Sequence, residues 1–294
     1  MKAFDYRAPT SLDEAVRILA DKGDRARPLA GGTDLLVQLR VGRFDLDVLV
    51  DVKRIPELIQ IRFRPDQPNA GLAIGAAVPC CQIYEDTRIQ AHYPAIIDSA
   101  SIVGGIGIQG RATLGGNLCN SSPSGDTIPA LICLGATAQI AGPNGSRTVP
   151  VADFCAAPGR SVLQKGEILV AIHLPLPKPH SGARYLRFIP RNEMDIAVVG
   201  VGASIVLAPD AATITEARIA LGAVGPTPIF AREAGEIMVG RAPTEETFAL
   251  AALAAQAAAR PITDVRGTTA QRRHLIGVFT KRALRGALER ALAR

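Results

Sequence analysis

The chain has 294 residues, of which 48% are hydrophobic and 20% are charged, a composition typical of a soluble globular protein. The formal net charge of +6 is mild, and with no Trp and only four Tyr the sequence does not predict a nucleic-acid partner. No apolar run reaches roughly 18 residues, and the N-terminus does not have the pattern of a signal peptide. We therefore expect no membrane span and a cytoplasmic location.

The cysteines do not follow a metal-binding or disulfide pattern. Their number is odd and no C-x-x-C occurs, so neither a disulfide framework nor a zinc or iron–sulfur site is predicted. The four histidines stand alone in the sequence and are expected to be structural. We expect no metal centre in this chain.

The first 55 residues have the pattern of a small α/β lobe. Ser11 and Glu14 form a capping box at the start of a helix that runs to Lys22 and ends at Gly23. Residues 48–52 are predicted to form a buried strand.

A pair of glycines separates a strand from a helix in this lobe. Residues 27–30 are predicted as the strand and residues 35–40 as the helix, which Gly42 ends and Thr33 or Asp34 caps. The turn between them is Gly31-Gly32, where free backbone N–H groups can hold an anion. A plain connection between strand and helix is the alternative.

A second Gly-Gly pair lies far downstream, at Gly115-Gly116. Thr113 offers a hydroxyl and Asn117 an amide, both suited to contacts with phosphates or a polar ring. Two such turns suit a ligand with two phosphates and a polar ring system. Asp126 begins an apolar stretch, where it is either a helix cap or an acceptor for a ligand hydroxyl or ring N–H.

Residues 105–110 match G-x-G-x-x-G, but the context does not fit a dinucleotide-binding fold. The preceding residues 100–103 make a poor strand, and residues 111–116 are not expected to be helical. We interpret the match as a coincidence in a glycine-rich loop. Short strands and glycine turns are expected to dominate between residues 72 and 174.

Residues 175–182 contain three prolines and a glycine and are the best candidate for a linker. Strand patterns at 197–207 and 214–221 follow, and then two helices rich in alanine and leucine, which together predict an α+β domain. The last helix is basic and amphipathic, and its basic face is expected to lie in solvent.

Taken together, these segments resemble the FAD-binding medium subunit of the molybdenum hydroxylases, a family that includes flavoproteins of carbon monoxide dehydrogenase, xanthine dehydrogenase and hydroxybenzoyl-CoA reductase. The similarity starts at residues 4–15 and passes through both glycine motifs. It continues at residues 167–172 and 189–200 and closes around residues 272–275.

The resemblance implies an α+β fold with a two-lobed, vanillyl-alcohol-oxidase-like FAD-binding domain at residues 1–176, whose lobes cover about 1–55 and 56–176. A smaller α+β domain would follow at residues 183–294. The residues whose backbone would hold the pyrophosphate are Leu29, Ala30, Gly31, Gly32, Thr33, Asp34, Gly115 and Gly116.

Other residues would contact the rest of the cofactor. Thr113, Asn117 and Asp126 would hydrogen-bond the flavin, the ribityl chain or phosphate, and Leu169 would pack on the isoalloxazine ring. Arg187 stands where relatives often have a lysine near the flavin, which keeps the charge but changes its shape. Some relatives place an aromatic residue on the other flavin face, but residues 102–108 contain none. The first glycine turn has no histidine, so noncovalent FAD is expected.

The implied function is electron transfer within a multi-subunit oxidoreductase. A large subunit would carry molybdopterin and a small subunit 2Fe–2S clusters, with electrons passing through the FAD of this chain to an external acceptor. One alternative is a self-sufficient FAD oxidoreductase, which needs a substrate acid such as Glu193 or Asp195. The other is an assembly module without flavin, which the intact glycine pairs argue against.

Overall fold

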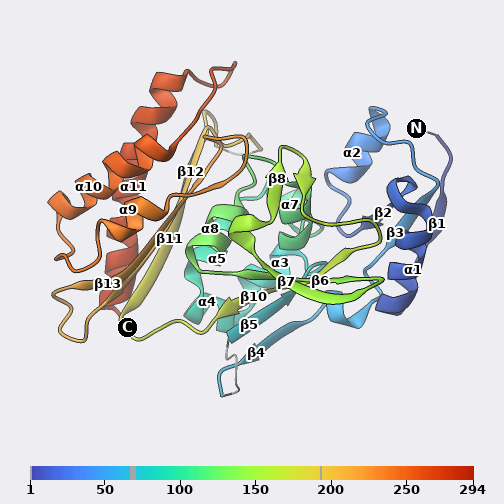
Figure 1. The fold of residues 1–294 in the computed structure, drawn as a ribbon, viewed down its shortest axis with the longest axis horizontal. Helices are drawn as coiled ribbons and strands as arrows, with labels where there is room; N and C mark the ends of the chain where they lie inside the picture. The colour runs from blue at the N-terminus through green and yellow to red at the C-terminus, as the bar shows by residue number, and fades with distance from the viewer. Residues whose placement is uncertain (1, 67–70, 193) are drawn as a thin grey trace.

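The computed structural model describes residues 2–66, 71–192 and 194–294. Its three larger sheets lie in a row along the long axis (Figure 1). The N-terminal sheet is at one end, a five-stranded sheet lies in the middle, and a four-stranded sheet of C-terminal residues is at the other end. No helix within the described residues is long and apolar enough to cross a membrane.

The N-terminal lobe is a parallel sheet in the order β1-β3-β2. Its elements are β1 (Asp5–Arg7), α1 (Leu12–Lys22), β2 (Ala26–Leu29), α2 (Leu35–Arg40), β3 (Val48–Asp51) and the 3-10 helices Gly23–Arg25 and Pro56–Leu58. The predicted cap of α1 is present, because Ser11 accepts a hydrogen bond from the Glu14 backbone N–H at 3.3 Å. Gly23 ends the helix with a φ of +54°.

The middle part holds an antiparallel sheet in the order β4-β5-β10-β6-β7. Its strands are β4 (Ile61–Arg64), β5 (Gly71–Gly75), β6 (Thr137–Gly142), β7 (Gly145–Pro150) and β10 (Ile168–Pro175), with the short pair β8 (Cys155–Ala157) and β9 (Arg160–Ser161) and the 3-10 helix Val151–Asp153 beside it.

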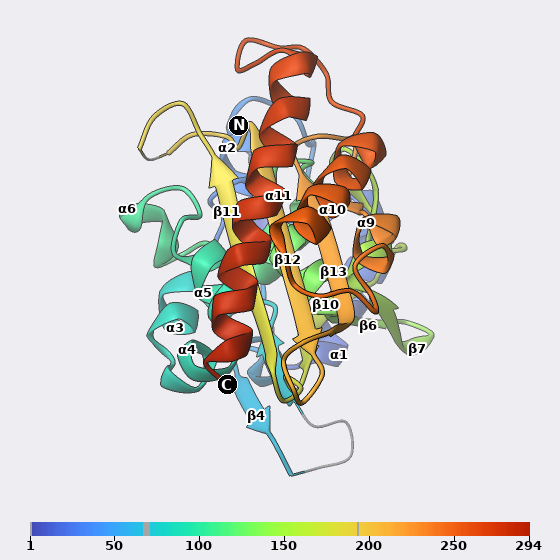
Figure 2. The same ribbon diagram turned by 90° about the vertical axis from the view of Figure 1, so that its left-hand side faces the viewer.

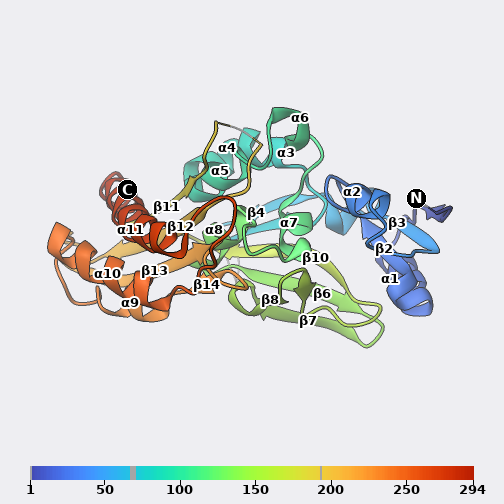
Figure 3. The same cartoon turned by 90° about the horizontal axis from the view of Figure 1, so that it is seen from above.

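Six helices stand between β5 and β6, so the prediction that strands and turns dominate here is wrong. They are α3 (Cys80–Glu85), α4 (Thr87–His92), α5 (Pro94–Ala100), α6 (Ile106–Gln109), α7 (Leu114–Asn120) and α8 (Thr127–Cys133). Each has seven residues or fewer, too few for a clear helical period in the sequence. Figure 3 shows α3 to α6 on the opposite side of the middle part from β6 and β7.

The C-terminal part is an antiparallel sheet in the order β11-β12-β13-β14 with helices on one face. Its elements are β11 (Ser181–Phe188), β12 (Val199–Leu207), β13 (Ile214–Gly222), β14 (Ile229–Phe230), α9 (Arg232–Glu236), α10 (Glu245–Ala258) and α11 (Thr269–Leu292). The predicted strands and the two long helices are therefore present. α11 lies along the sheet, with α10 and α9 beside it (Figure 2).

The other face of this sheet packs against the middle part. The contact with α8 is close enough that a Cβ at Gly202 would lie 2.5 Å from the carbonyl oxygen of Pro129. Asp98 of α5 binds the Arg290 guanidinium of α11 through both oxygens, at 2.7 and 2.9 Å. The basic face of α11 is thus only partly in solvent, and Arg272, which is 3% exposed, is buried outright.

Candidate functional site

A cavity of about 500 Å³ lies where the N-terminal lobe meets the middle part. Both glycine pairs line it, although they are more than 80 positions apart in the sequence. It is also lined by most of the residues from 159 to 169, which lead from β9 into β10. A cavity of this size is in the usual range for a small-molecule or cofactor site.

Ten of the thirteen residues predicted to bind the cofactor line this cavity. They are Ala30, Gly31, Gly32, Thr33, Asp34, Thr113, Gly115, Gly116, Asn117 and Leu169. The other three, Leu29, Asp126 and Arg187, do not line it. The side chain of Leu29 packs in a small core with Leu39, Leu46 and Leu49, whereas Asp126 and Arg187 bind each other.

The first glycine turn presents backbone groups to the cavity. The backbone N–H groups of Gly31, Gly32 and Thr33 donate no hydrogen bond to another group in the described part of the chain. Gly32 has a φ of +79°, which a β-branched residue would adopt only with strain. Neither predicted cap of α2 is formed, because Asp34 holds the cap position without a side-chain hydrogen bond.

Two basic residues support this turn from behind. The ammonium of Lys53 donates to the Ala30 carbonyl oxygen at 3.1 Å, and Nε of Arg111 donates to the Gly31 carbonyl oxygen at 3.3 Å. Both carbonyls are thereby held away from the cavity, which leaves the N–H groups for an anion. Neither contact could be inferred from spacing, because the partners are up to 80 positions apart.

The second glycine pair is helical because α7 begins at Leu114, which corrects the prediction for residues 114–116, whereas residues 111–113 are not helical, as predicted. Thr113 caps α7, and its Oγ1 accepts from the Gly116 N–H at 2.8 Å. A Cβ at Gly115 would lie 2.3 Å from the Ala76 carbonyl oxygen, so this glycine is required by protein packing. A Cβ at Gly116 would meet only Oγ1 of Thr113 within 4 Å. Gly116 is therefore the glycine of this pair with open space where a side chain would stand, and this open side lies in the cavity.

Gly31 also has a packing role, since a Cβ there would lie 1.9 Å from the Arg111 carbonyl oxygen. From the sequence, all four glycines are expected to hold the pyrophosphate through their backbone. The structure divides them: Gly31 and Gly115 fit against neighbouring backbone, Gly32 permits a left-handed conformation, and Gly116 leaves open space.

The Asp126 carboxylate binds other side chains of the protein and does not cap α8. It occupies the cap position of α8 without a side-chain hydrogen bond to the helix. Its carboxylate accepts from the Tyr185 hydroxyl at 2.9 Å and from the Arg187 guanidinium at 2.6 Å. The Asp126 and Arg187 side chains are only 11% and 7% exposed, so the charges form a buried pair between α8 and β11. Tyr185 of β11 is thus the third member of this buried group.

Burial changes the pKa values of Asp126 and Tyr185. It raises the pKa of Asp126 to about 6, although the Arg187 charge and the hydrogen bonds from Tyr185 and Arg187 act in the opposite direction. Burial, together with the Asp126 carboxylate, also raises the pKa of Tyr185 well above its usual value. The tyrosine is therefore a stable hydrogen-bond donor across the neutral range.

Asn117 connects this buried pair to the cavity wall. Its Oδ1 accepts from the Thr127 hydroxyl at 2.8 Å and from the Thr127 N–H at 3.3 Å, and Thr127 directly follows Asp126. The Asn117 side chain is thus fixed with its oxygen turned to α8. Its amide NH₂ is not used by these contacts and is the group that can donate to a ligand.

The wall contains charged residues that the sequence did not single out. Four basic side chains line the cavity: Arg27, Arg43, Arg160 and Lys165. Of the acidic lining residues, Glu167 is neutralised by Arg147 through two contacts of 2.7 Å. An excess of positive charge suits an anionic ligand. No local motif marks these positions, since they come from three separate segments of the chain.

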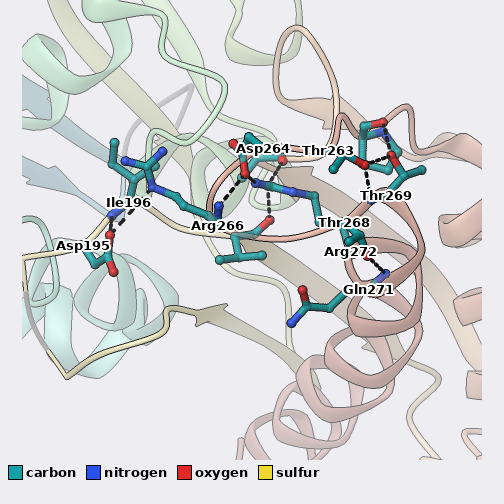
Figure 4. Close-up of polar contacts among 12 residues, drawn as sticks. Asp195, Ile196, Thr263, Asp264, Arg266, Thr268, Thr269, Gln271 and Arg272 are labelled. Carbon is teal, nitrogen blue, oxygen red and sulfur yellow. Dashed lines mark hydrogen bonds and ion pairs between the residues drawn. The ribbon is translucent and has the colours of Figure 1, made fainter.

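The acids near residues 189–200 are engaged elsewhere. Asp195 lies 3.8 Å from the Arg266 guanidinium and 3.7 Å from that of Arg191, while Asp264 binds Arg272 at 2.7 Å (Figure 4). Arg272 also donates to the carbonyl oxygens of Val198 and Ala223. These contacts join the β11–β12 loop to the start of α11 and give Asp195 a structural role. Glu193, the other candidate acid, lies outside the described residues.

Family models cover both parts of the chain. Residues 2–177 match the FAD binding domain in molybdopterin dehydrogenase, and residues 184–287 match the CO dehydrogenase flavoprotein C-terminal domain. The xanthine dehydrogenase FAD-binding subunit of Escherichia coli O157:H7 is 33% identical over 287 residues, which is 97% of this chain and 96% of that protein.

This chain is also similar to carbon monoxide dehydrogenase flavoproteins. The medium chain from Afipia carboxidovorans is 32% identical over 290 residues, with 98% of each chain covered. A chain in the structure of reconstituted CO dehydrogenase from Oligotropha carboxidovorans superimposes with a TM-score of 0.92 at 30% identity, covering 98% of this chain and 99% of that one. The chain therefore belongs to the family of FAD-binding flavoprotein subunits of the molybdopterin-dependent dehydrogenases, which are oxidoreductases.

Proposed function

We propose that this chain holds FAD noncovalently and transfers electrons within a larger dehydrogenase. Electrons would arrive from 2Fe–2S clusters of a small partner subunit and leave to an external acceptor. The substrate would be oxidised at molybdopterin on a large partner subunit. The observation that carries the proposal is that both glycine pairs line one and the same cavity.

The residues around the cavity fit a dinucleotide. The free N–H groups of Gly31, Gly32 and Thr33 suit the pyrophosphate, and the open side of Gly116 leaves room for it. The amide NH₂ of Asn117 and the lining cations supply donors to phosphate and sugar oxygens. FAD supplies the redox chemistry when it is bound, and the chain supplies binding, orientation and electrostatics.

Partner subunits are supported by the nature of the relatives. Those described above are named as a subunit or a chain of a dehydrogenase, and this chain covers almost their full length. In this chain, the acids near the β11–β12 loop that the structure describes are tied into ion pairs. A substrate site on another subunit is consistent with that arrangement.

Purified protein is expected to release all of its flavin on acid precipitation. The turn at Gly31-Gly32 is followed by Thr33, and no histidine lines the cavity, so a covalent link to a histidine of this wall is not expected. Absorbance and mass of the supernatant identify the flavin. Yellow colour in the pellet would contradict noncovalent binding, and FMN in place of FAD would contradict the pyrophosphate assignment.

The isolated chain is expected to be reduced by dithionite but to show no dehydrogenase activity with purines, aldehydes or carbon monoxide. The reason is that the substrate-oxidising centre is proposed to lie on another subunit. Flavin absorbance during anaerobic reduction and steady-state assays with artificial acceptors measure the two properties. Turnover of any of these substrates by the chain alone would establish a self-sufficient flavoenzyme instead.

A further inference from the structure

Helix α10 is apolar on its solvent side as well as on its buried side. No charged residue stands between Glu246 and Arg260 in the sequence. Phe248 and the alanines near it pack into the core of the C-terminal part, whereas Leu250 and Leu253 are 41% and 63% exposed. A helix that is apolar on all sides is normally covered on all sides. The outer face of α10 is therefore expected to have a partner.

The helix beside α10 has a different surface. α11 also lies on the outside of the C-terminal sheet (Figure 2), but its exposed residues include Arg273, Arg282 and Glu289. Figure 1 shows α10 at the end of the molecule opposite the N-terminal lobe. A partner on α10 would therefore leave the cavity with the glycine pairs open.

The exposed apolar residues of α10 form one stripe. Leu250, Leu253 and Ala257 are all exposed, and they follow one another at intervals of three and four positions. This spacing places their side chains on one side of the helix. It is the spacing of residues at the contact between two packed helices.

Each end of the stripe carries a charge. Glu246 lies in the first turn of α10 and is exposed on the side of the stripe. At the other end, the Arg260 guanidinium donates to the Ala257 carbonyl oxygen at 2.6 Å. In the described part of the chain, neither Glu246 nor Arg260 forms an ion pair. Both charges are thus available to a partner.

The stripe is complementary to itself when two copies of α10 lie antiparallel. With a twofold axis at Leu253, the two Leu253 side chains meet. Leu250 then faces the smaller Ala257 of the other copy, and large side chains fit best against small ones. Glu246 faces the Arg260 guanidinium of the other copy, and the two helix dipoles oppose each other favourably. A twofold interface requires this kind of self-complementarity.

We propose that two copies of this chain associate through α10, packed antiparallel about a twofold axis at Leu253. The inference does not depend on the binding of FAD. Since α10 is about 21 Å long, the helix pair buries less than the roughly 1,200 Å² of a standard stable complex. The dimer is therefore expected to be reversible, with micromolar affinity. Within an assembly with other subunits, this contact would join two assemblies.

The test measures the mass of the full chain by analytical ultracentrifugation over a range of concentrations. It compares the wild type with Leu253→Glu, Glu246→Arg and Arg260→Glu, and with an equimolar mixture of the two charge variants. Val41→Glu and Asp13→Arg are the matched controls, because both positions are exposed in the N-terminal lobe.

The wild type and both controls are expected to form dimers as the concentration rises. Leu253→Glu should raise the dissociation constant at least about 100-fold, because it places two carboxylates against each other in an apolar contact. Each charge reversal alone should raise it at least about tenfold, because like charges then meet at both ends of the stripe. The mixture should regain the wild-type affinity, because a heterodimer of the two variants again pairs opposite charges at both ends.

Three outcomes would overturn the inference. A wild-type chain that stays monomeric at millimolar concentration would mean that a different protein covers α10. A dimer that persists in Leu253→Glu would lie on another surface. A mixture that associates no better than the single variants would exclude the antiparallel arrangement. Thermal unfolding identifies any variant that does not fold, and FAD binding, measured separately by absorbance, tests the proposed function alone.

Discussion

A valine at position 116 is expected to lower FAD affinity at least about 100-fold while the fold is kept, a loss equivalent to about 2.7 kcal/mol. A Cβ at Gly116 would meet no atom within 4 Å except Oγ1 of Thr113 at 3.0 Å. The branched side chain would therefore occupy the cavity without displacing protein. Fluorescence titration of the stripped protein with FAD measures the affinity, and thermal unfolding without FAD reports the fold.

Two other glycines serve as controls. A Cβ at Gly107 has no atom within 4 Å and does not line the cavity, so Gly107→Val should bind FAD normally. Gly115→Val should instead destabilise the protein by several kcal/mol, because its Cβ would lie 2.3 Å from a backbone oxygen of Ala76. Normal FAD affinity in Gly116→Val would mean that the diphosphate does not lie at the second glycine pair.

Replacing Arg187 by methionine is expected to destabilise the flavin-free chain by about 3 kcal/mol or more at pH 8. The substitution leaves the Asp126 carboxylate buried with only the Tyr185 hydroxyl as a partner, and an uncompensated buried charge is costly. Adding Asp126→Leu should restore much of the loss, because it removes that charge. Urea unfolding of the wild type, both single variants and the double variant measures the coupling. Equal losses in Arg187→Met and in the double variant would contradict this account.

The loss of stability caused by removing Arg187 is expected to depend on pH. Burial raises the pKa of Asp126 to about 6 in the folded chain, against 3.8 for the free group. The folded state therefore binds more protons than the unfolded state between these values, so this group's contribution to stability is complete below about pH 4 and is lost as the pH rises through about 6. Removing Arg187 should cost less at pH 5 than at pH 8. A loss that does not change with pH would show that the Asp126 charge is not its cause.

Features that depend on local sequence were predicted well. The capping box at Ser11, the strand–turn–helix around Gly31 and the strands of the C-terminal part all have signals that lie within a few residues of one another. The second glycine pair was placed at the cavity, but its helical conformation was missed. The Thr113 cap and the contact of Gly115 with Ala76 stabilise that helix, and the second of these is a tertiary contact.

The candidate site was predictable only where a motif marks it. Nothing in the sequence indicates that Asp126 binds Arg187, since the two are 61 positions apart. The positions of Arg27 and Phe44 in the cavity wall were also not predicted, because single residues on separate segments form no periodic pattern and no motif of fixed spacing. Their proximity is a result of the β2–β3 sheet and the loop after α2, which only the folded chain brings together.

The sheet β11–β14 has consequences for how the chain unfolds. One of its faces is covered by α11 and the other by α8, with a Cβ at Gly182 only 2.1 Å from the Ala287 carbonyl oxygen on the α11 side. Tyr185 and Ala220 of this sheet belong to the same apolar core as the helices of the middle part. The C-terminal part also has an apolar core of its own, but separating it from the middle part would expose this shared face to water. We therefore expect heating to melt the two parts in one calorimetric transition, although two separate family models describe the chain.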